Sequence, residues 1–203
     1  MIPMIDTVIF DIGNVLTEWH WRDSFAQMFG EELVEPLADA TVRSPGWYEL
    51  DRGALSEEEL VDLLTQNAPE YGDEIARIVH ECHDFVTVYP YAADWLRGLK
   101  AAGYQVYILS NFSEFGFERA KSRFDFLEYA DGGVISYEIK EVKPDRIIYD
   151  TLCKKYGIEP SRAVFLDDRP ENTEAAIAYG MHAITVETKA QTDAALHALG
   201  VHW

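Results

Sequence analysis

The sequence predicts an α/β protein in which a doubly wound parallel sheet is interrupted by an inserted group of helices. Short apolar runs alternate along the chain with stretches of helical periodicity, and this alternation is typical of βαβ units. The charges are divided unevenly, because residues 18–89 contain 17 acidic and four basic side chains whereas the rest of the chain contains 19 and 13. This difference indicates an acidic insertion, residues 18–89, in a more balanced frame, residues 1–17 and 90–203.

Five runs are expected to form the strands of the sheet. Four of them are continuously apolar or nearly so, which fits strands that are buried on both faces of a parallel sheet. The run at 132–135 is a weaker candidate. The expected strands, in chain order, are 7–10, 106–109, 132–135, 163–166 and 183–186.

The remaining periodic stretches are expected to be helices. In the frame these are 91–102, 114–126, 145–156, 170–179 and 189–199. In the insertion, Ser56 and Glu59 form a capping box at the start of a helix over 57–66, whose leucines share one face. Further helices are expected at 23–29, 33–41 and 73–85. The insertion is therefore expected to contain helices only.

Composition and charge exclude several classes of partner. The chain has 203 residues, 48% of them hydrophobic, which argues against disorder. A net charge of −19 repels nucleic acids and anionic membranes, so neither is expected as a partner. No apolar run reaches the roughly 18 residues of a membrane span, and residues 1–6 do not resemble a signal peptide. Cys82 and Cys153 form no metal motif and are expected to be core thiols of a cytoplasmic protein.

Polar side chains directly follow three of the expected strands. Asp11 follows the first strand, Ser110 and Asn111 follow the second, and Asp167 and Asp168 follow the fourth. In open parallel sheets, ligands bind outside the carboxyl ends of the strands. The sequence therefore predicts a site at this edge of the sheet.

Each of these residues also has a purely structural explanation. An Asp or Ser after a strand is commonly a turn former or a helix cap, and Lys143 precedes a proline that could begin a helix. The adjacent Asp167 and Asp168 are harder to explain in this way, because two carboxylates repel each other unless a cation or donors compensate. The order of these residues along the chain and their positions directly after the expected strands together favour a functional site.

Four segments support a resemblance to a known family. They are Phe10-Asp11-Ile12-Gly13-Asn14-Val15-Leu16, Ile108-Leu109-Ser110-Asn111, Val142-Lys143-Pro144-Asp145 and Phe165-Leu166-Asp167-Asp168, the last followed by Asn172-Thr173-Glu174-Ala175-Ala176. With these segments the chain resembles hydrolases of the haloacid dehalogenase (HAD) superfamily. The resemblance implies a Rossmann-like core with strand order 5-4-1-2-3, made of residues 1–17 and 90–203, and an α-helical cap, residues 18–89.

Within that superfamily a subgroup is also suggested. Asp11-Ile12-Gly13-Asn14-Val15, together with Gly46-Trp47-Tyr48, Arg52-Gly53 and Ser56, resembles sugar-phosphate phosphatases. This group includes α-glucose-1-phosphate phosphatase-like enzymes and is akin to the phosphatase domain of soluble epoxide hydrolases. The expected substrate is therefore a small phosphorylated metabolite, a sugar phosphate in particular, and the expected assembly is a monomer or homodimer.

The resemblance implies a Mg²⁺-dependent phosphatase that reacts through an aspartyl-phosphate. Asp11 is the implied nucleophile. The implied metal ligands are Asp11, the backbone carbonyl of Gly13, and one or both of Asp167 and Asp168. The implied phosphate-binding residues are Ser110, Asn111 and Lys143, of which Lys143 also neutralises the charge of the nucleophile.

One position departs from the phosphatase pattern. Most phosphatases of the family have a second Asp two residues after the nucleophile as general acid, and this chain has Gly13 there. General acid–base catalysis contributes about 10²–10⁴-fold, so its loss should be felt with poor leaving groups. Glu18 and His20 are the candidates to replace it, although both would also fit a solvent-facing hinge.

Aromatic and basic residues in the insertion are candidates for substrate recognition. Trp47 and Arg52 are expected to contact substrate, because aromatic faces suit sugar C–H surfaces and a guanidinium binds hydroxyl or phosphate oxygens. Trp19, Trp21 and Tyr48 lie near them in the sequence. The junctions near 16–20 and 87–91 are expected to be hinges that let the cap close and exclude water.

Two other functions stay open at this stage. One is a 2-haloacid dehalogenase, which shares the nucleophile, lacks the second Asp and needs no metal. The adjacent Asp167 and Asp168 argue against it, because uncompensated carboxylates repel an acidic substrate. The other is a catalytically weak relative with a binding or regulatory role, which Gly13 keeps open.

Overall fold

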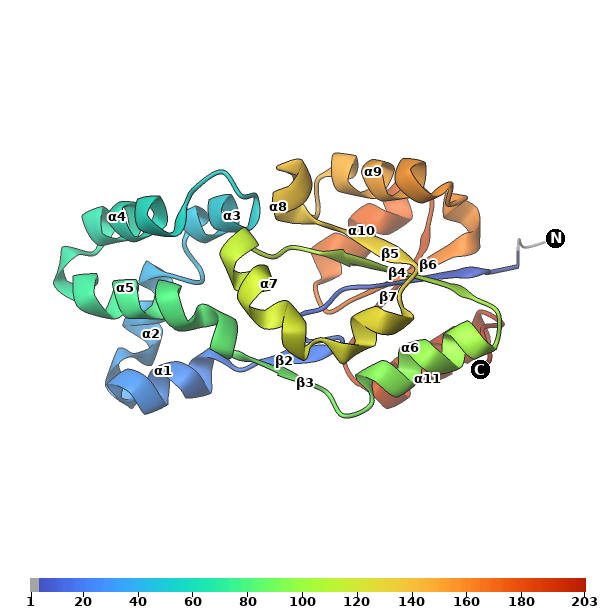
Figure 1. Ribbon diagram of the computed structural model, residues 1–203, viewed down its shortest axis with the longest axis horizontal. Helices are drawn as coiled ribbons and strands as arrows, with labels where there is room; N and C mark the ends of the chain where they lie inside the picture. The colour runs from blue at the N-terminus through green and yellow to red at the C-terminus, as the bar shows by residue number, and fades with distance from the viewer. Residues whose placement is uncertain (1–3) are drawn as a thin grey trace.

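A five-stranded parallel sheet forms the centre of the frame in the computed structural model, which describes residues 4–203 (Figure 1). The strands are β1 (Thr7–Phe10), β4 (Gln105–Ser110), β5 (Gly132–Ile135), β6 (Ala163–Asp167) and β7 (His182–Thr185). Their order is β5-β4-β1-β6-β7, with every neighbouring pair parallel. Counted among themselves, they lie in the order 3-2-1-4-5, which is the expected order read from the opposite edge. The predicted fold class is confirmed. Residues 1–3 of the predicted core lie outside the described residues.

Helices cover both faces of the sheet. One face packs on α6 (Ala92–Ala101) and α11 (Lys189–Ala198), and the other on α9 (Arg146–Tyr156) and α10 (Pro170–Tyr179). Side chains alternate along a strand, so in β1 Val8 and Phe10 join the first layer and Ile9 joins the second. Burial on both faces explains why these strands have continuously apolar sequences.

The inserted residues form a separate layer of helices with a hydrophobic core of their own. The helices are α1 (Trp21–Phe29), α2 (Glu31–Ala40), α3 (Pro45–Asp51), α4 (Glu57–Asn67) and α5 (Gly72–Glu81). Phe25, Leu37 and Leu60 belong to their shared core. The predicted capping box begins α4, because the Glu59 N–H donates to Ser56 Oγ at 3.2 Å and the Ser56 N–H donates to Glu59 Oε2 at 2.8 Å. The short helix α3 was not predicted.

The expectation that the insertion contains helices only is wrong. Strands β2 (Thr17–Trp19) and β3 (Val86–Val88) pair antiparallel, with Glu18 opposite Thr87, and form a two-stranded ribbon. Three-residue strands are too short to show an alternating pattern in the sequence. The ribbon lies between the sheet and the inserted helices, where hinges were expected. The two segments that connect them are therefore hydrogen-bonded to each other. We propose that the cap begins and ends at this ribbon.

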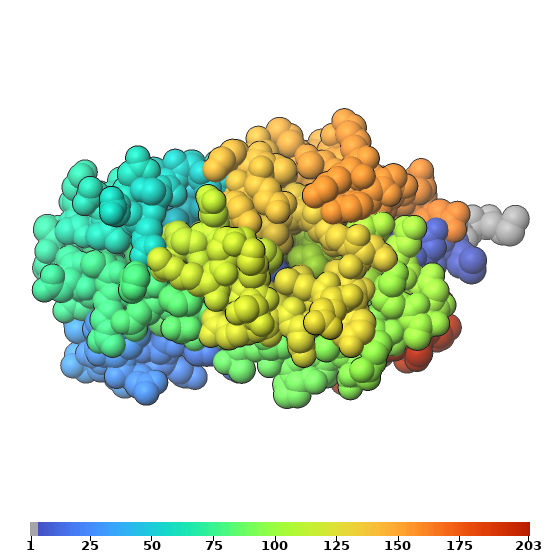
Figure 2. Space-filling model, in the orientation of Figure 1, coloured from blue at the N-terminus to red at the C-terminus, as the bar shows by residue number. Residues whose placement is uncertain are grey.

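Two predicted helices are shorter than expected. Helix α7 (Glu114–Ala120) gives way to 3₁₀ turns over Lys121–Arg123 and Asp125–Tyr129, and α5 gives way to a 3₁₀ turn over Cys82–Asp84. A short helix, α8 (Ser136–Ile139), follows β5. Figure 2 shows α7 and the segments after it packed over the junction between the inserted helices and the sheet on this side of the molecule. No helix within residues 4–203 has the length and apolar character needed to cross a membrane.

Candidate active site

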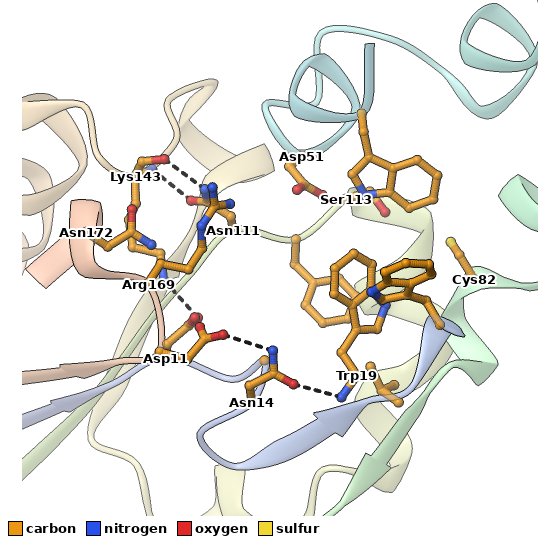
Figure 3. Close-up of a pocket in the computed structure, with 16 residues that line it drawn as sticks. Asp11, Asn14, Trp19, Asp51, Cys82, Asn111, Ser113, Lys143, Arg169 and Asn172 are labelled. Carbon is orange, nitrogen blue, oxygen red and sulfur yellow. Dashed lines mark hydrogen bonds and ion pairs between the residues drawn. The ribbon is translucent and has the colours of Figure 1, made fainter. Parts of the chain in front are cut away.

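A cavity of about 380 Å³ lies where the carboxyl ends of β1, β4 and β6 meet the inserted helices (Figure 3). Residues of the sheet side form its floor, among them Asp11, Asn111 and Asp168. Residues of the inserted helices and ribbon, among them Trp47 and Asp51, form the opposite wall. The predicted edge of the sheet is therefore the floor of the cavity.

Asp11 follows β1 directly, and its carboxylate is held from one side. The Ile12 N–H donates to Oδ1 at 2.8 Å, Ser110 Oγ donates to the same oxygen at 2.6 Å, and Lys143 Nζ lies 2.9 Å from it. No donor to the other oxygen, Oδ2, is recorded within residues 4–203. Hydrogen bonds and an ion pair therefore fix Oδ1 of Asp11, whereas Oδ2 is left without a recorded partner in this part of the chain.

Lys143 lies between two carboxylates in the buried floor. Its Nζ is 2.9 Å from Asp11 Oδ1 and 2.6 Å from Asp167 Oδ2. Burial lowers the pKa of Lys143, but the charges of Asp11 and Asp167 outweigh burial and raise it above its ordinary value. Lys143 is therefore a permanent cation beside Asp11.

Asp167 is saturated by donors, and Asp168 is not. Asp167 accepts from Lys143 Nζ, from Asn172 Nδ2 at 2.9 and 3.1 Å, and from the Arg169 N–H at 2.9 Å. Asp168 faces the cavity, and Asn14 Nδ2 donates to its Oδ2 at 2.9 Å. The two neighbouring carboxylates thus point to different surroundings.

Asn14 is placed by an unusual backbone conformation. Its φ of 54° lies in the left-handed region, which Asn tolerates better than most residues. Its side chain donates to Asp168 and accepts from the Trp19 N–H at 3.1 Å. Asn14 therefore links the acidic floor to the ribbon, as Figure 3 shows.

Asn111 and Ser110 differ in their access to the cavity. Asn111 lines it, and the side chain also forms a reciprocal pair with the backbone of Lys143, at 3.0 Å from Nδ2 to the carbonyl and 2.8 Å from the amide to Oδ1. Ser110 is buried and is not among the lining residues, because its hydroxyl points to Asp11. The structure therefore places Ser110 as a partner of Asp11.

The floor has more negative than positive charge. Burial raises the pKa of Asp11 to about 7, while Lys143 lowers it and Asp167 raises it. Burial also raises the pKa of Asp168. One further cation would relieve this excess of carboxylates.

The residues present fit a magnesium ion. Asp11, Asp167 and Asp168 each offer one carboxylate oxygen, and these three oxygens lie within 4.8 Å of one another. Mg²⁺ prefers oxygen ligands of this kind. Gly13 lines the same cavity, so its backbone is close to these carboxylates. Because Asp167 already accepts from Lys143, Asn172 and a backbone amide, Asp168 is the acid with the freer oxygen.

Arg52, Glu18 and His20 do not reach the cavity. Arg52 turns to the core surface, where its guanidinium is 3.2 Å from Glu141 Oε2 and 3.4 Å from Asp145 Oδ2. His20 is held between Ser24 and Thr87 by its two ring nitrogens, and Glu18 is exposed on the ribbon. This placement does not agree with direct substrate contact by Arg52, because its guanidinium is already paired with the carboxylates of Glu141 and Asp145.

Sequence reasoning missed two charged residues of the cavity. Asp51, at the end of α3, and Arg169, directly after Asp168, both line it. Arg169 donates to Tyr48 Oη at 2.8 Å and so joins the core to α3. The position of Arg169 next to the paired aspartates could have indicated it, whereas no sequence signal indicated Asp51.

The wall above the floor is largely aromatic. Trp47, the candidate for substrate contact, lines the cavity, and so do Trp19, Trp21 and Phe112. Cys82 also lines it; the half-buried side chain packs against the core of the inserted helices, and burial raises the pKa of its thiol to about 12. The wall offers flat apolar surfaces to the part of a ligand that lies away from the carboxylates.

The chain is similar to several known proteins over most of its length. The sequence model of the haloacid dehalogenase-like hydrolases matches residues 5–180. The chain is 28% identical over 204 residues to a D-ribitol-5-phosphate phosphatase of Bacteroides thetaiotaomicron, covering 92% of this chain and 94% of that protein. It is 24% identical over 181 residues to a sesquiterpene phosphatase of Aspergillus oryzae, covering 89% of each.

A partial match and a structural match complete the comparison. The (S)-2-haloacid dehalogenase 4A of Burkholderia cepacia is 29% identical over 101 residues, 50% of this chain and 44% of that protein. A HAD family enzyme of Bacteroides thetaiotaomicron, crystallised with magnesium and inorganic phosphate, has a similar fold, with a TM-score of 0.70 and 22% identity over 91% of this chain and 96% of that one.

Proposed function

Because the chain belongs to the haloacid dehalogenase-like hydrolase family, we propose that it is a Mg²⁺-dependent phosphatase that hydrolyses a small phosphorylated metabolite through an aspartyl-phosphate on Asp11. The observation that supports this most directly is the asymmetry of the Asp11 carboxylate. Three donors hold Oδ1, no donor to Oδ2 is recorded within residues 4–203, and Asp11 lines the cavity. A fixed carboxylate with one open oxygen is suited to attack phosphorus in line.

Each floor residue has a proposed role in this reaction. Asp11 Oδ2 attacks the phosphorus, and Ser110 holds the other oxygen of the carboxylate. Lys143 lowers the negative charge that Asp11 and the incoming phosphate share. Asn111 donates to a phosphoryl oxygen while its pairing with the Lys143 backbone keeps the two residues in register.

Asp168 is the proposed direct carboxylate ligand of the metal, together with Asp11 and the carbonyl of Gly13. Asp167 would act mainly by holding Lys143, since its oxygens already accept from three residues. When bound, Mg²⁺ neutralises the phosphate and so reduces its repulsion from the acidic floor.

A sugar phosphate is the proposed substrate class. The cavity volume of about 380 Å³ is at the low end of small-molecule sites, which suits a compact alcohol portion. Trp47 and the neighbouring aromatic side chains offer flat faces on which the C–H surface of a sugar or polyol can lie. The curated relatives act, by name, on a ribitol phosphate and on a sesquiterpene, so the class of alcohol varies among similar proteins.

Phosphate release from a panel of esters tests the proposal. The panel contains p-nitrophenyl phosphate, sugar 1-phosphates, sugar 6-phosphates and pentitol phosphates, each with Mg²⁺ and with EDTA. We expect turnover with Mg²⁺ and its loss with EDTA. Turnover that is independent of divalent metal contradicts the proposal.

The nucleophile has its own test. Asp11→Asn should lower kcat by at least about 10³-fold while leaving the fold unchanged, because a covalent nucleophile is lost. Asp62→Asn, an exposed acid on α4, is the matched control and should keep wild-type turnover. Residual activity of more than a few per cent in Asp11→Asn rules out the assigned role.

A 2-haloacid dehalogenase is the second candidate. The absence of an acid at Gly13 and the partial match to a dehalogenase favour it. Asp168 disfavours it, because its carboxylate faces the cavity and repels a carboxylate substrate. Chloride release from 2-chloropropionate in EDTA would support this candidate, and the absence of both activities would indicate the binding or regulatory relative.

A further inference from the structure

One carboxylate of the cavity belongs to neither the metal cluster nor the predicted site. Asp51 is the last residue of α3 and lines the cavity on the side of the inserted helices. In Figure 3 it lies across the cavity from Asp11 and Asn14. No hydrogen bond or ion pair to its carboxylate is recorded within residues 4–203. It is therefore free to act on a group bound in the cavity.

The backbone around Asp51 is anchored to the core at several points. Ser136 Oγ donates to the Asp51 carbonyl, and Lys140 Nζ donates to the Gly53 carbonyl. Arg52, between them, pairs with Glu141 and with Asp145. All of these core partners lie in the segment that follows β5 and contains Lys143. Asp51 and Lys143 are therefore held by the same stretch of chain.

The surroundings of Asp51 favour its protonated form near neutral pH. Its pKa is raised to about 7, first by burial and then by the charge of Asp11, against the opposing charges of Arg169 and Lys143. The other titratable group that faces it is the Cys82 thiol, whose own pKa is raised to about 12. An acid whose pKa is close to the working pH can both give and take a proton efficiently.

We propose that Asp51 is the general acid and base of the reaction, supplied by α3 in place of the acid that Gly13 lacks. This inference rests on the phosphatase function proposed above. It extends that function by assigning the proton transfer to the inserted helices, on the opposite side of the substrate from the nucleophile.

The two steps balance as follows. In the first, Asp11 Oδ2 forms a bond to phosphorus, the bond between phosphorus and the ester oxygen breaks, and the Asp51 proton passes to that oxygen to release the alcohol. In the second, the Asp51 carboxylate takes a proton from water as the water oxygen attacks phosphorus. The bond between phosphorus and Asp11 then breaks, which releases inorganic phosphate and restores both side chains.

Other proton donors of the region are less suitable. Glu18 and His20 do not line the cavity. Cys82 is a very weak acid, and Arg169 keeps its proton at any accessible pH. Asp168 lies on the floor in the same acidic cluster as Asp11. In-line attack by Asp11 would direct the leaving group away from the floor, toward the wall on which Asp51 lies.

The test compares leaving groups in Asp51→Asn and in the wild type. The esters are p-nitrophenyl, phenyl and hexyl phosphate, in order of decreasing acidity of the alcohol. Asp62→Asn is the control, because it removes one acid of the same type from an exposed position on α4. Thermal unfolding of each variant shows whether it is folded.

We expect kcat/KM of Asp51→Asn to change little for p-nitrophenyl phosphate and to fall by about 10²–10⁴-fold for hexyl phosphate, because only the poor leaving group needs the proton. The variant should also show a burst of nitrophenol and accumulate phosphorylated Asp11, detectable by intact-mass spectrometry, because the second step loses its base. Asp62→Asn should match the wild type in both measurements.

The outcomes separate the two proposals. If the wild type hydrolyses the esters but folded Asp51→Asn loses the same factor with all three and shows no burst, Asp51 is structural and the phosphatase proposal stands. If the wild type hydrolyses none of the esters, both proposals fail. A loss that grows as the alcohol becomes less acidic supports Asp51 as the acid.

Discussion

The three aspartates of this site have different proposed roles because their oxygens meet different donors. Among residues 4–203, Asp11 has three donors on one oxygen and no recorded donor on the other, which suits the proposed nucleophile. Asp167 accepts on both oxygens and holds Lys143. Asp168 faces the cavity with one donor from Asn14. The number of donors at each oxygen therefore distinguishes the proposed nucleophile, the proposed support of Lys143 and the proposed metal ligand.

This difference predicts distinct effects at the two neighbouring acids. Asp168→Asn should raise the Mg²⁺ concentration for half-maximal rate by more than about 10-fold, because a direct ligand is lost. Asp167→Asn should mainly lower kcat, since Lys143 loses one of its two carboxylate partners. Mg²⁺ titrations of activity, with isothermal calorimetry as a second readout, measure both effects. Equal shifts in Mg²⁺ requirement would contradict the assignment.

Gly13 allows the missing acid to be restored. A Cβ built at this position meets no atom within 4 Å, and the backbone is not in the left-handed region, so an Asp fits without strain. In an Asp51→Asn background, Gly13→Asp should recover at least about 10-fold of the kcat/KM lost with hexyl phosphate. Gly13→Asn, which fills the same space without an ionisable group, should recover none. Equal recovery by both variants would show that the effect is not proton transfer.

At the scale of elements, the short helix α3 joins the two sides of the cavity. Pro45 begins it at the first helical position, and Gly46 allows close approach to α4, where an added Cβ would lie 3.1 Å from Leu63 Cδ2. Trp47 and Asp51 are four residues apart, so both face the cavity from one side of the helix. Arg52 then fastens the end of α3 to the core.

The ion pairs of Arg52 with Glu141 and Asp145 should affect kcat/KM more than the free energy of unfolding. Arg52→Ala should cost less than about 1 kcal/mol of unfolding free energy, because its ion pairs are partly solvated. It should lower kcat/KM by about 10-fold or more, because a small displacement of Asp51, the proposed general acid, would strongly reduce the rate. Arg43→Ala, whose partners Glu35 and Asp39 lie within the inserted helices, is the control. Similar kinetics in both variants would dismiss the positioning role.

At the scale of the whole molecule, the site concentrates negative charge at the junction of two hydrophobic cores. The sheet core and the inserted core each bury their own apolar side chains, and the cavity lies between them. The protein has a net charge of −19, so the metal-free site lies in a generally repulsive field. Protonation or metal binding at the site should therefore stabilise the whole fold.

The raised pKa values predict how stability depends on pH without metal. Asp11 and Asp51 have pKa values of about 7 in the folded protein against an ordinary value of 3.8 for Asp, so between about pH 4 and 7 the folded state binds more protons than the unfolded state. Their contribution to stability is complete below about pH 4 and is lost as the pH rises through 7.

Asp51→Asn removes one of these titrations. Relative to the wild type, we expect the metal-free variant to gain unfolding free energy as the pH rises from 4 to 8, measured by urea denaturation in EDTA. Asp62→Asn, which removes an exposed acid from α4, is the control. A pH-independent difference for Asp51→Asn would contradict the raised pKa.

The sequence by itself determined the sheet and the floor of the site. Strands buried on both faces have continuously apolar sequences, and the polar residues that follow them must lie at one edge, so Asp11, Asn111 and the pair Asp167–Asp168 could be located without coordinates. The capping box at Ser56 could also be predicted from the sequence, because it depends only on two residues three positions apart.

Only the tertiary structure decided the opposite wall. Asp51 is 40 positions from Asp11 in the sequence, and its direction depends on how α3 packs against the core, which no local pattern encodes. Arg52, one residue further, faces Glu141 and Asp145 instead, because successive helical residues point in different directions. The ribbon of β2 and β3 is also decided by pairing across the insertion. Local sequence specifies elements and their ends, whereas long-range packing specifies which side chains from separate elements meet.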